Sequence, residues 1–338
     1  MQNSQPTLGQ PLQIGPVTAR NRVFLAPLSG ISDLPFRQLA WRHGAGLVFT
    51  EMVASRELVT DNRESLARLR GDGIDPHVVQ LAGREARWMG EAAKIAEASG
   101  AAMIDINMGC PAKKVTGGYS GSALMRDPDH ALGLIEATVN AVSVPVTVKM
   151  RLGWDHDNLN APLIAARAEA AGVKMITIHG RTRMQFYKGS ADWDAIARVR
   201  EAVTVPLIAN GDVTSRADIH ECLRRSGADA VMVGRAAQGQ PWICGELAGS
   251  ADVPPDQAAR HAVALEHYRM MVRHYGDDVG VRHARKHIGW YLETLAPQTP
   301  ASQKARLMTS GRADEVLGIF AEVLAAAAGS PSLMESAA

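Results

Sequence analysis

The chain has 338 residues, of which 46% are hydrophobic, and a formal net charge of +1 at pH 7. Its polar start has no signal-peptide pattern and no apolar run is long enough to cross a bilayer, so we expect a soluble, cytoplasmic protein without membrane contact. Three cysteines without a Cys-x-x-Cys pair argue against a disulfide scaffold or a bound metal, while the near-neutral charge neither favours nor excludes nucleic acid.

Short apolar runs recur along the first 247 residues, and each ends in a polar residue, a proline or a glycine. The runs end at Pro27, Glu51, Gln80, Asn107, Lys149, His179, Asn210 and Gly234. Between them, apolar residues follow helical spacing at 88–98, 131–142, 163–171 and 219–226. Strands alternating with helices predict an α/β protein with a parallel sheet, and eight such units predict a (β/α)8 TIM barrel. The carboxyl ends of its strands would meet at one mouth.

The strand pattern stops after a stretch of small residues and prolines at 248–255. Beyond it, apolar residues spaced by three and four predict helices at 256–276, 281–295 and about 312–328. We therefore expect a catalytic barrel domain at 1–247, a linker at 248–255, a small all-helical domain at 256–328 and a mobile tail at 329–338.

Cys110 is the strongest candidate for a catalytic residue. It follows an apolar run and lies between Gly109 and Pro111, which predicts a turn at the barrel mouth. Loop residues at this end of a barrel tend to be functional. Cys222 and Cys244 have helix-like surroundings and are expected to fill the core. Redox chemistry at this mouth would need an organic cofactor.

Other candidates stand at neighbouring strand ends. Lys149 ends the run Pro-Val-Thr-Val-Lys, which predicts a positive charge facing an anionic or electron-rich ligand. Gln80 offers donors and an acceptor to a planar heterocycle. His179 is either a site residue or a hydrogen-bonded structural histidine. Arg181 and Arg183 either bind phosphate or pair with surface carboxylates.

Two glycine-containing turns predict a phosphate site. They follow the seventh and eighth strands, which is where barrels of this kind usually hold phosphate, and they consist of Asn210, Gly211, Asp212, Gly234 and Arg235. In the helical region, Arg282, Arg285 and Lys286 are spaced to share one helical stripe. That stripe is either a solvated face or a binding surface for an anion.

These motifs together resemble the flavin-dependent tRNA-dihydrouridine synthase family, most closely its bacterial B-type. The resemblance covers the chain from about Leu12 to the final helix, and the matching segments are 25–37, 107–115, 121–125, 177–183, 208–212, 233–243 and 285–291. Two features depart from the family pattern. Leu28 and Ser29 stand where the family often has Met and Ala, and the loop at 116–120 is unusually rich in glycine.

The resemblance implies an FMN-binding barrel, a helical tRNA-binding domain and NADPH as the usual electron donor. By motif position the flavin ring would contact Pro27, Leu28, Ser29, Gln80 and Lys149, with His179 nearby, and its phosphate would bind Asn210, Gly211, Asp212, Gly234 and Arg235. Hydride would reach C6 of uracil, Cys110 would protonate C5, and Asn107 would hydrogen-bond the uracil edge. Arg181, Arg282, Arg285 and Lys286 would bind tRNA, and the target uridine would lie in the D loop, with position 17 as one candidate.

Two other functions stay open at this stage. A flavoenzyme of the same fold could reduce a free pyrimidine or enone, although a small substrate needs no helical docking domain. A non-catalytic RNA chaperone could keep the barrel as a scaffold, although it would not need Cys110 and Lys149. The sequence indicates no stable protein partner and no metal.

Overall fold

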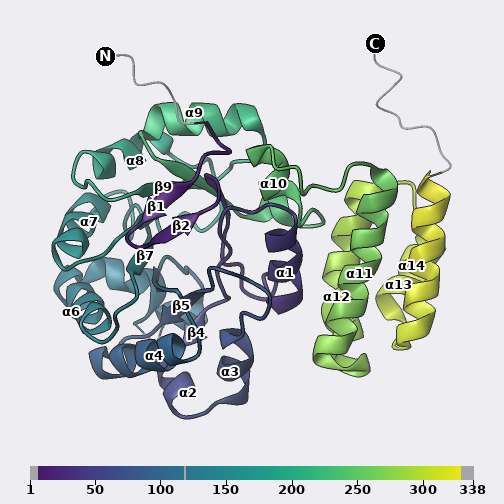
Figure 1. The fold of residues 1–338 in the computed structure, drawn as a ribbon, viewed down its shortest axis with the longest axis horizontal. Helices are drawn as coiled ribbons and strands as arrows, with labels where there is room; N and C mark the ends of the chain where they lie inside the picture. The colour runs from purple at the N-terminus through teal and green to yellow at the C-terminus, as the bar shows by residue number, and fades with distance from the viewer. Residues whose placement is uncertain (1–6, 118, 329–338) are drawn as a thin grey trace.

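The computed structural model describes residues 7–117 and 119–328, and within them the predicted barrel is confirmed (Figure 1). One parallel eight-stranded sheet has the order β3-β10-β9-β8-β7-β6-β5-β4. Its strands are β3 (Val23–Leu25), β4 (Val53–Ala54), β5 (Val78–Ala82), β6 (Met103–Met108), β7 (Val146–Arg151), β8 (Ile176–His179), β9 (Leu207–Asn210) and β10 (Ala230–Val233). Parallel bridges from Val48 to Leu25 and from Phe49 to Val78 close the sheet into a barrel.

The second barrel strand differs from the sequence prediction, which ended it at Glu51. It pairs at Val48 and Phe49 and continues as β4 only from Val53. Between these segments, polar side chains bind neighbouring backbone: Thr50 accepts from the amide of Gln80 at 2.9 Å, and Glu51 accepts from the amide of Gly30. These side-chain bonds accompany the break between the bridge residues and β4.

Helices surround the sheet, as the predicted βαβ repeat requires (Figure 1). They are α1 (Leu34–Arg42), α2 (Ser55–Val59), α3 (Arg63–Leu69), α4 (Ala86–Ala98), α5 (Lys113–Thr116), α6 (Pro128–Val139), α7 (Ala161–Ala170), α8 (Trp193–Arg200), α9 (Arg216–Ser226) and α10 (Ile243–Ala248), with 3-10 turns η1 (Gly121–Arg126) and η2 (Arg235–Ala237). The predicted helices at 88–98, 131–142, 163–171 and 219–226 correspond to α4, α6, α7 and α9. Each begins two or three residues earlier than predicted, because apolar spacing does not mark the first turn of a helix. The cap residues do: Asp127 accepts from His130, and Ser215 and Asp218 form a capping box.

An antiparallel hairpin, β1 (Leu12–Ile14) with β2 (Val17–Ala19), covers the amino-terminal end of the barrel. Its residues Leu12 and Ile14 pack in one cluster with Val78, Met103 and other residues that begin barrel strands. The polar strand ends lie at the opposite end, which this hairpin leaves open.

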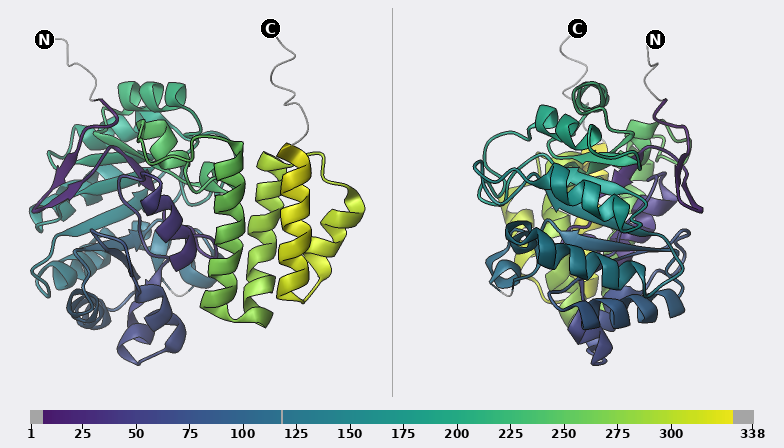
Figure 2. Two further views of the ribbon diagram at one scale, coloured as in Figure 1. Left: turned by 45° about the vertical axis from the view of Figure 1, so that its right-hand side comes forward. Right: turned by 90° about the vertical axis from the view of Figure 1, so that its left-hand side faces the viewer.

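The helical region follows as α11 (Gln257–Tyr275), α12 (Asp277–Leu295), α13 (Ala301–Thr309) and α14 (Ala313–Ala328), which confirms the predicted bundle beside the barrel (Figure 2). Its core includes Tyr268, Ile288 and Phe320, and also Leu39 of α1 and Trp242, so the bundle and the barrel share packing. The division into domains with a linker at 248–255 stays a prediction. The tail at 329–338 lies outside the described residues.

Among the described helices, none combines the length and apolar character that a membrane span needs.

Candidate functional site

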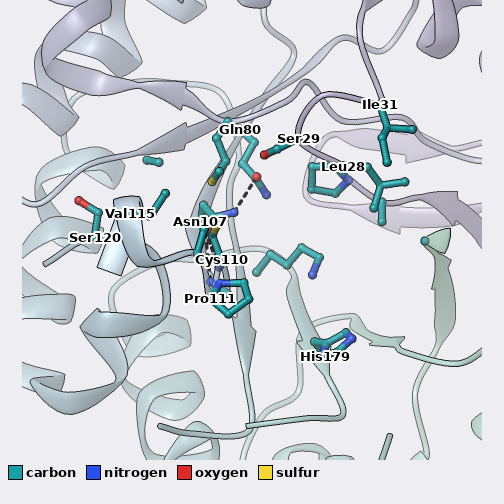
Figure 3. A pocket seen from close by; sticks show the side chains of 18 of the residues that line it. Leu28, Ser29, Ile31, Gln80, Asn107, Cys110, Pro111, Val115, Ser120 and His179 are labelled. Atoms are coloured by element: carbon teal, nitrogen blue, oxygen red, sulfur yellow. Dashed lines mark hydrogen bonds between the residues drawn. The ribbon is translucent and has the colours of Figure 1, made fainter. Parts of the chain in front are cut away.

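A cavity of about 1300 Å³ opens at the carboxyl ends of the barrel strands (Figure 3). Most of the residues singled out in the sequence line it: Pro27, Leu28, Ser29, Gln80, Asn107, Cys110, Lys149, His179, Asn210, Gly211, Asp212, Gly234 and Arg235. The fold therefore brings them to one place from seven strand ends. Arg181, Arg282, Arg285 and Lys286 do not line this cavity. The functional roles of all these residues remain predictions.

A buried chain of side-chain hydrogen bonds positions the cysteine loop. Asn107 donates to Gln80 at 2.8 Å, and Gln80 donates to Asp105 at 2.7 Å. Thr147 donates to the other oxygen of Asp105 at 2.6 Å. The carbonyl oxygen of Asn107 accepts from the backbone amide of Cys110 at 3.0 Å, as the dashed lines in Figure 3 show. Asn107 thus holds the loop, and one hydrogen of its amide group remains for a ligand.

Cys110 is half-buried at the cavity wall. Burial raises the pKa of its thiol, although a backbone hydrogen bond from Ala112 and the charges of Arg151 and Lys149 oppose this. The backbone carbonyl of Cys110 accepts from the hydroxyl of Ser122 at 2.8 Å. Gly121 is required here, since its φ is +61° and a Cβ would stand 2.9 Å from that carbonyl oxygen. The thiol is therefore fixed in place and protonated at neutral pH.

Lys149 is almost fully buried, and its ammonium group donates to the side-chain oxygen of Asn210 at 3.0 Å. Asn210 is fixed in turn by donating to the carbonyl of Met232 at 2.8 Å. Burial lowers the pKa of Lys149 to about 8, with Arg151 adding to this and Asp105 opposing it. The amine still carries a charge at neutral pH and presents it to the cavity.

Arg151 also lines the cavity, and the sequence analysis missed it. Its guanidinium donates to the carbonyl of Gly109 at 2.8 Å and to the carbonyls of Thr182 and Phe186 at 2.8 and 2.9 Å. It therefore ties the cysteine loop to the loop after β8. The signal was present in the sequence, because Arg151 lies two residues after Lys149 and so points to the same side of β7.

His179 is buried, and its pKa lies well below the ordinary value because of burial and the nearby charges of Lys149 and Arg151. It is therefore neutral. Its Nδ1 is buried and has no hydrogen-bond partner among the described residues. An unpaired buried nitrogen at a cavity wall fits a polar ligand atom.

The two predicted phosphate turns present bare backbone. Gly211 has a φ of +121°, and a Cβ there would stand 2.8 Å from the Cβ of Ala191, so only glycine fits. At Gly234 the nearest atom to such a Cβ is 3.9 Å away, which leaves open space. Asp212 is different, because its carboxylate is paired with Arg181 at 2.5 Å and with Arg235 at 3.3 Å. The backbone and Arg235 therefore fit an oxyanion, whereas the carboxylate of Asp212 organises the arginines.

Arg181 has a structural position. It is 2% exposed, and besides Asp212 its guanidinium donates to the carbonyls of Gly189 at 2.6 Å and Lys188 at 3.2 Å. A side chain this deeply enclosed has little surface to offer to RNA. The sequence left open whether Arg183 pairs with a carboxylate at the surface. In the structure its side chain is buried beside Trp154 and Phe186.

The three cations of α12 diverge. Arg282 is exposed. Arg285 donates to the carbonyls of Thr309 and Ser310, at 3.2 and 3.3 Å, and so caps the end of α13. The amine of Lys286 lies 3.5 Å from where a Cβ on Gly30 would stand, next to the loop that carries Leu28 and Ser29. Among residues 7–117 and 119–328 Arg282 has no carboxylate partner, so the stripe consists of one exposed cation, one that caps α13 and one at the rim of the barrel mouth.

No group of three or more His, Cys, Asp or Glu side chains within residues 7–117 and 119–328 could hold a metal ion.

Comparisons with known proteins agree with this geometry. The family model described as "Dihydrouridine synthase (Dus)" matches residues 24–326. The chain is 66% identical over 300 residues to a "Probable tRNA-dihydrouridine synthase" of Rhizobium leguminosarum bv. phaseoli, with 89% of this chain and 94% of that protein covered. It is 46% identical over 294 residues to "tRNA-dihydrouridine synthase B" of Pseudomonas aeruginosa, covering 84% and 87% of the two chains. Among solved structures, morphinone reductase shares the fold, with a TM-score of 0.53, 15% identity and coverage of 77% of this chain and 94% of that one.

Proposed function

Because this chain belongs to the dihydrouridine synthase family, we propose that it reduces the C5=C6 bond of specific uridines in the D loop of tRNA, with FMN as resident cofactor and NADPH as electron donor. The observation that carries the proposal is the convergence of the Cys110 thiol, the Lys149 ammonium group and the glycine turns on one cavity. Flavin-dependent reduction of a conjugated C=C bond uses all three: a proton donor for the carbon, a cation beside the flavin ring and an oxyanion cradle for the flavin phosphate.

FMN fits the residues present. Its phosphate would bind the backbone amides at Gly211 and Gly234, where no side chain intervenes, and the guanidinium of Arg235. Its ring would lie against Lys149, with the unpaired nitrogen of His179 available to a ring heteroatom. When bound and reduced, FMN supplies the hydride that adds to C6 of uracil.

The reduction needs a proton as well as a hydride. Uracil conjugates its C5=C6 bond with the C4 carbonyl, so addition at C6 moves negative charge towards C5 and O4. Cys110 donates its proton to C5, which completes the addition of two hydrogens and leaves a thiolate to be reprotonated from water. Burial raises the pKa of this thiol, which keeps its proton in place until the carbon becomes basic. The charges of Lys149 and Arg151 then stabilise the thiolate.

The chain also positions the base. The side chain of Asn107 has one amide hydrogen free to bond the uracil edge, while its oxygen fixes the cysteine loop. The uridine must leave its stack to enter the cavity, which costs about a few kcal/mol. Contacts elsewhere on the tRNA must supply that energy, and Lys286 of α12, beside Gly30, and the exposed Arg282 one turn earlier are candidates for them.

Cys110→Ala tests the proposal. We expect the variant to bind FMN and to oxidise NADPH as the wild type does, but to form dihydrouridine about 10²- to 10⁴-fold more slowly, because the general acid is gone. Mass spectrometry of nucleosides from a reacted tRNA transcript measures this. Cys222→Ala, which removes a thiol from α9, is the control. Wild-type turnover by Cys110→Ala would remove the acid role, and equal turnover of free uridine and tRNA would favour a small-molecule reductase.

A further inference from the structure

Two arginines alternate with three aromatic side chains beside the barrel mouth. The guanidinium of Arg183 lies 4.6 Å from the ring centre of Phe186 and 4.7 Å from that of Trp154. The guanidinium of Arg126 lies 4.3 Å from the ring of Trp154 and 5.6 Å from that of Tyr119. Phe186, Arg183, Trp154, Arg126 and Tyr119 thus form a continuous row, which we call the arginine–aromatic ladder.

The ladder is assembled from separate loops that are bonded together. Tyr119 follows the helix next to Cys110, Arg126 ends η1, Trp154 follows β7, and Arg183 and Phe186 follow β8. The amide of Arg183 donates to the carbonyl of Gly153 at 3.0 Å, and the amide of Met184 donates to that of Trp154 at 2.9 Å. These two backbone hydrogen bonds hold Trp154 and Arg183, the inner members of the ladder, in place.

The ladder leads away from the site cavity into a second hollow. Phe186 lines the site cavity, whereas Tyr119 and Arg126 line a neighbouring cavity of about 640 Å³. Arg84 and Glu85 line both cavities, so the two adjoin. A chain-like ligand that inserts one unit into the site could continue along this row.

Within the described residues, neither Arg126 nor Arg183 forms an ion pair with a carboxylate. Two carboxylates line the second cavity with Arg126: Glu85 lies 3.6 Å from the guanidinium of Arg84, and one oxygen of Asp127 caps α6 by accepting from the amide of His130. At the outer end Arg126 is exposed, and Tyr119 is 65% exposed, which is unusual for a large aromatic side chain.

We propose that the outer end of the ladder is a subsite for the unpaired nucleotide next to the target uridine in the same RNA strand, with its base stacked on Tyr119 and its phosphate paired with Arg126. Aromatic faces stack with any base, and arginines between them bind the backbone, so such rows suit single-stranded RNA. This inference rests on the proposed function, because it assigns the strand that the target uridine belongs to. The stacking offsets part of the cost of extruding that uridine.

Tyr119→Ala and Arg126→Gln test the subsite, with Tyr119→Phe and the exposed Arg198→Gln of α8 as matched controls. Binding of an unmodified tRNA transcript to the FMN-loaded enzyme is measured over a range of salt concentrations. We expect Tyr119→Ala to weaken binding by roughly tenfold and Tyr119→Phe to bind like the wild type, because the ring is what stacks. Arg126→Gln should reduce the slope of log affinity against log salt by about one, and Arg198→Gln should leave it unchanged.

Unchanged affinity for Tyr119→Ala together with an unchanged salt slope for Arg126→Gln would overturn the subsite. So would weaker binding accompanied by a lower melting temperature or loss of FMN, because a ladder that only knits the loops together would give that result. Dihydrouridine formation by the wild-type enzyme is measured in the same samples. If it is present while the variants bind normally, the subsite alone is wrong. If it is absent, the proposed function fails.

Discussion

Lys149 is the cavity residue whose charge changes close to neutral pH. Burial lowers its pKa to about 8, with a contribution from Arg151, while Asp105 and Cys110 pull it upward. The amine is charged below that pKa and neutral above it. Its partner Asn210 carries no charge, so an anionic ligand would be the group that best stabilises the ammonium form.

We expect the affinity of the apoenzyme for FMN to fall as pH rises through about 8, because Lys149 then loses its proton. Lys149→Met should bind FMN more weakly, by roughly 10- to 100-fold at neutral pH, because a hydrogen bond to a charged group is lost. It should also show a flatter pH profile. Titrations that follow flavin fluorescence on both sides of that pKa measure both effects. Lys94→Met on the exposed side of α4 is the control, and a wild-type pH profile in Lys149→Met would assign the titration elsewhere.

Asn107 acts on catalysis through Cys110. Asn107→Ala removes the oxygen that accepts from the backbone amides of Gly109 and Cys110. It also removes the hydrogen bond that Asn107 donates to the side-chain oxygen of Gln80. We expect the rate of dihydrouridine formation to fall by roughly 10²-fold, because a small displacement of the acid is costly. Single-turnover reaction of reduced enzyme with tRNA measures the rate. Alkylation of Cys110 should become faster as its loop loosens, and an unchanged rate for both reactions would contradict this role.

Sequence reasoning at the residue scale found side chains at strand ends but not their partners. Cys110, Lys149 and Gln80 were identifiable because each interrupts an apolar pattern at a predictable point. The pairing of Arg181 with Asp212, and of Arg285 with the end of α13, depends on loops that meet only in the folded chain. Sequence spacing gives no information about such contacts. For this reason Arg181 and Arg285 were predicted to contact the substrate, although the folded chain gives each of them a partner within the protein.

At the scale of elements, α12 links the helical region to the barrel mouth. Lys286 stands beside Gly30, and the hydroxyl of Tyr275 in α11 donates to Asp33 at 3.1 Å. Asp33 also caps α1 by accepting from Phe36 at 3.0 Å. Burial raises the pKa of Asp33 to about 6, with the neighbouring Glu51 adding to this and hydrogen bonds opposing it. The loop that lines the cavity at Leu28 and Ser29 is thus bounded by the helices.

The two arginines of α12 should respond differently to charge reversal. Arg282→Glu should weaken tRNA binding and make its salt dependence shallower by about one or more, because Arg282 is exposed and free to meet phosphate. Arg285→Glu should chiefly lower the melting temperature, because its guanidinium caps α13 through Thr309 and Ser310. Filter binding and thermal unfolding separate the two. If Arg282→Glu keeps the wild-type salt dependence of tRNA binding, Arg282 does not contact tRNA and this face of α12 is only solvated.

Periodicity predicted the elements with a long apolar stripe and missed those without one. The helices α4, α6, α7 and α9 of the barrel and α11, α12 and α14 of the helical region were predicted in this way, whereas barrel helices such as α1 and α8 were not. The short helix α13 contributes only Leu307 to the buried core, so its sequence carries almost no pattern. The β1–β2 hairpin has three-residue strands, and the second barrel strand is interrupted by side-chain bonds at Thr50 and Glu51. Such elements exist because of tertiary contacts.

At the scale of the whole molecule, the barrel and the helical region are joined by an aromatic cluster. Phe36 of α1 packs against the rings of both His267 and His287, at 5.6 and 5.7 Å between ring centres, and the two histidine rings contact each other at 4.7 Å. The Nδ1 of His267 is 3.0 Å from the hydroxyl of Tyr291, and Tyr291 stacks on Trp242. At the rim of the contact, Arg42 of α1 pairs with Glu266 of α11 at 2.5 Å. The shared apolar packing implies that the two regions unfold together.

That contact should weaken in acid. Burial lowers the pKa of His267 to about 3 in the folded protein, from an ordinary value of 6.5. A group whose folded pKa is depressed favours unfolding as pH falls below its unfolded value, because the unfolded chain then binds the proton more readily. His267 alone should therefore cost about 2 kcal/mol of unfolding free energy between about pH 7 and about pH 5.

Urea unfolding at these two pH values measures the loss. In His267→Leu, which cannot bind the proton, we expect a smaller pH dependence even though the bond to Tyr291 is lost and stability at neutral pH is lower. His156→Gln, in an exposed loop, should keep the wild-type difference. The burial of His287 also lowers its pKa, so some pH dependence should persist in His267→Leu. An undiminished pH dependence in His267→Leu would place the proton uptake outside this contact, and the coupling of the two regions would then rest on apolar packing around Leu39 and Trp242.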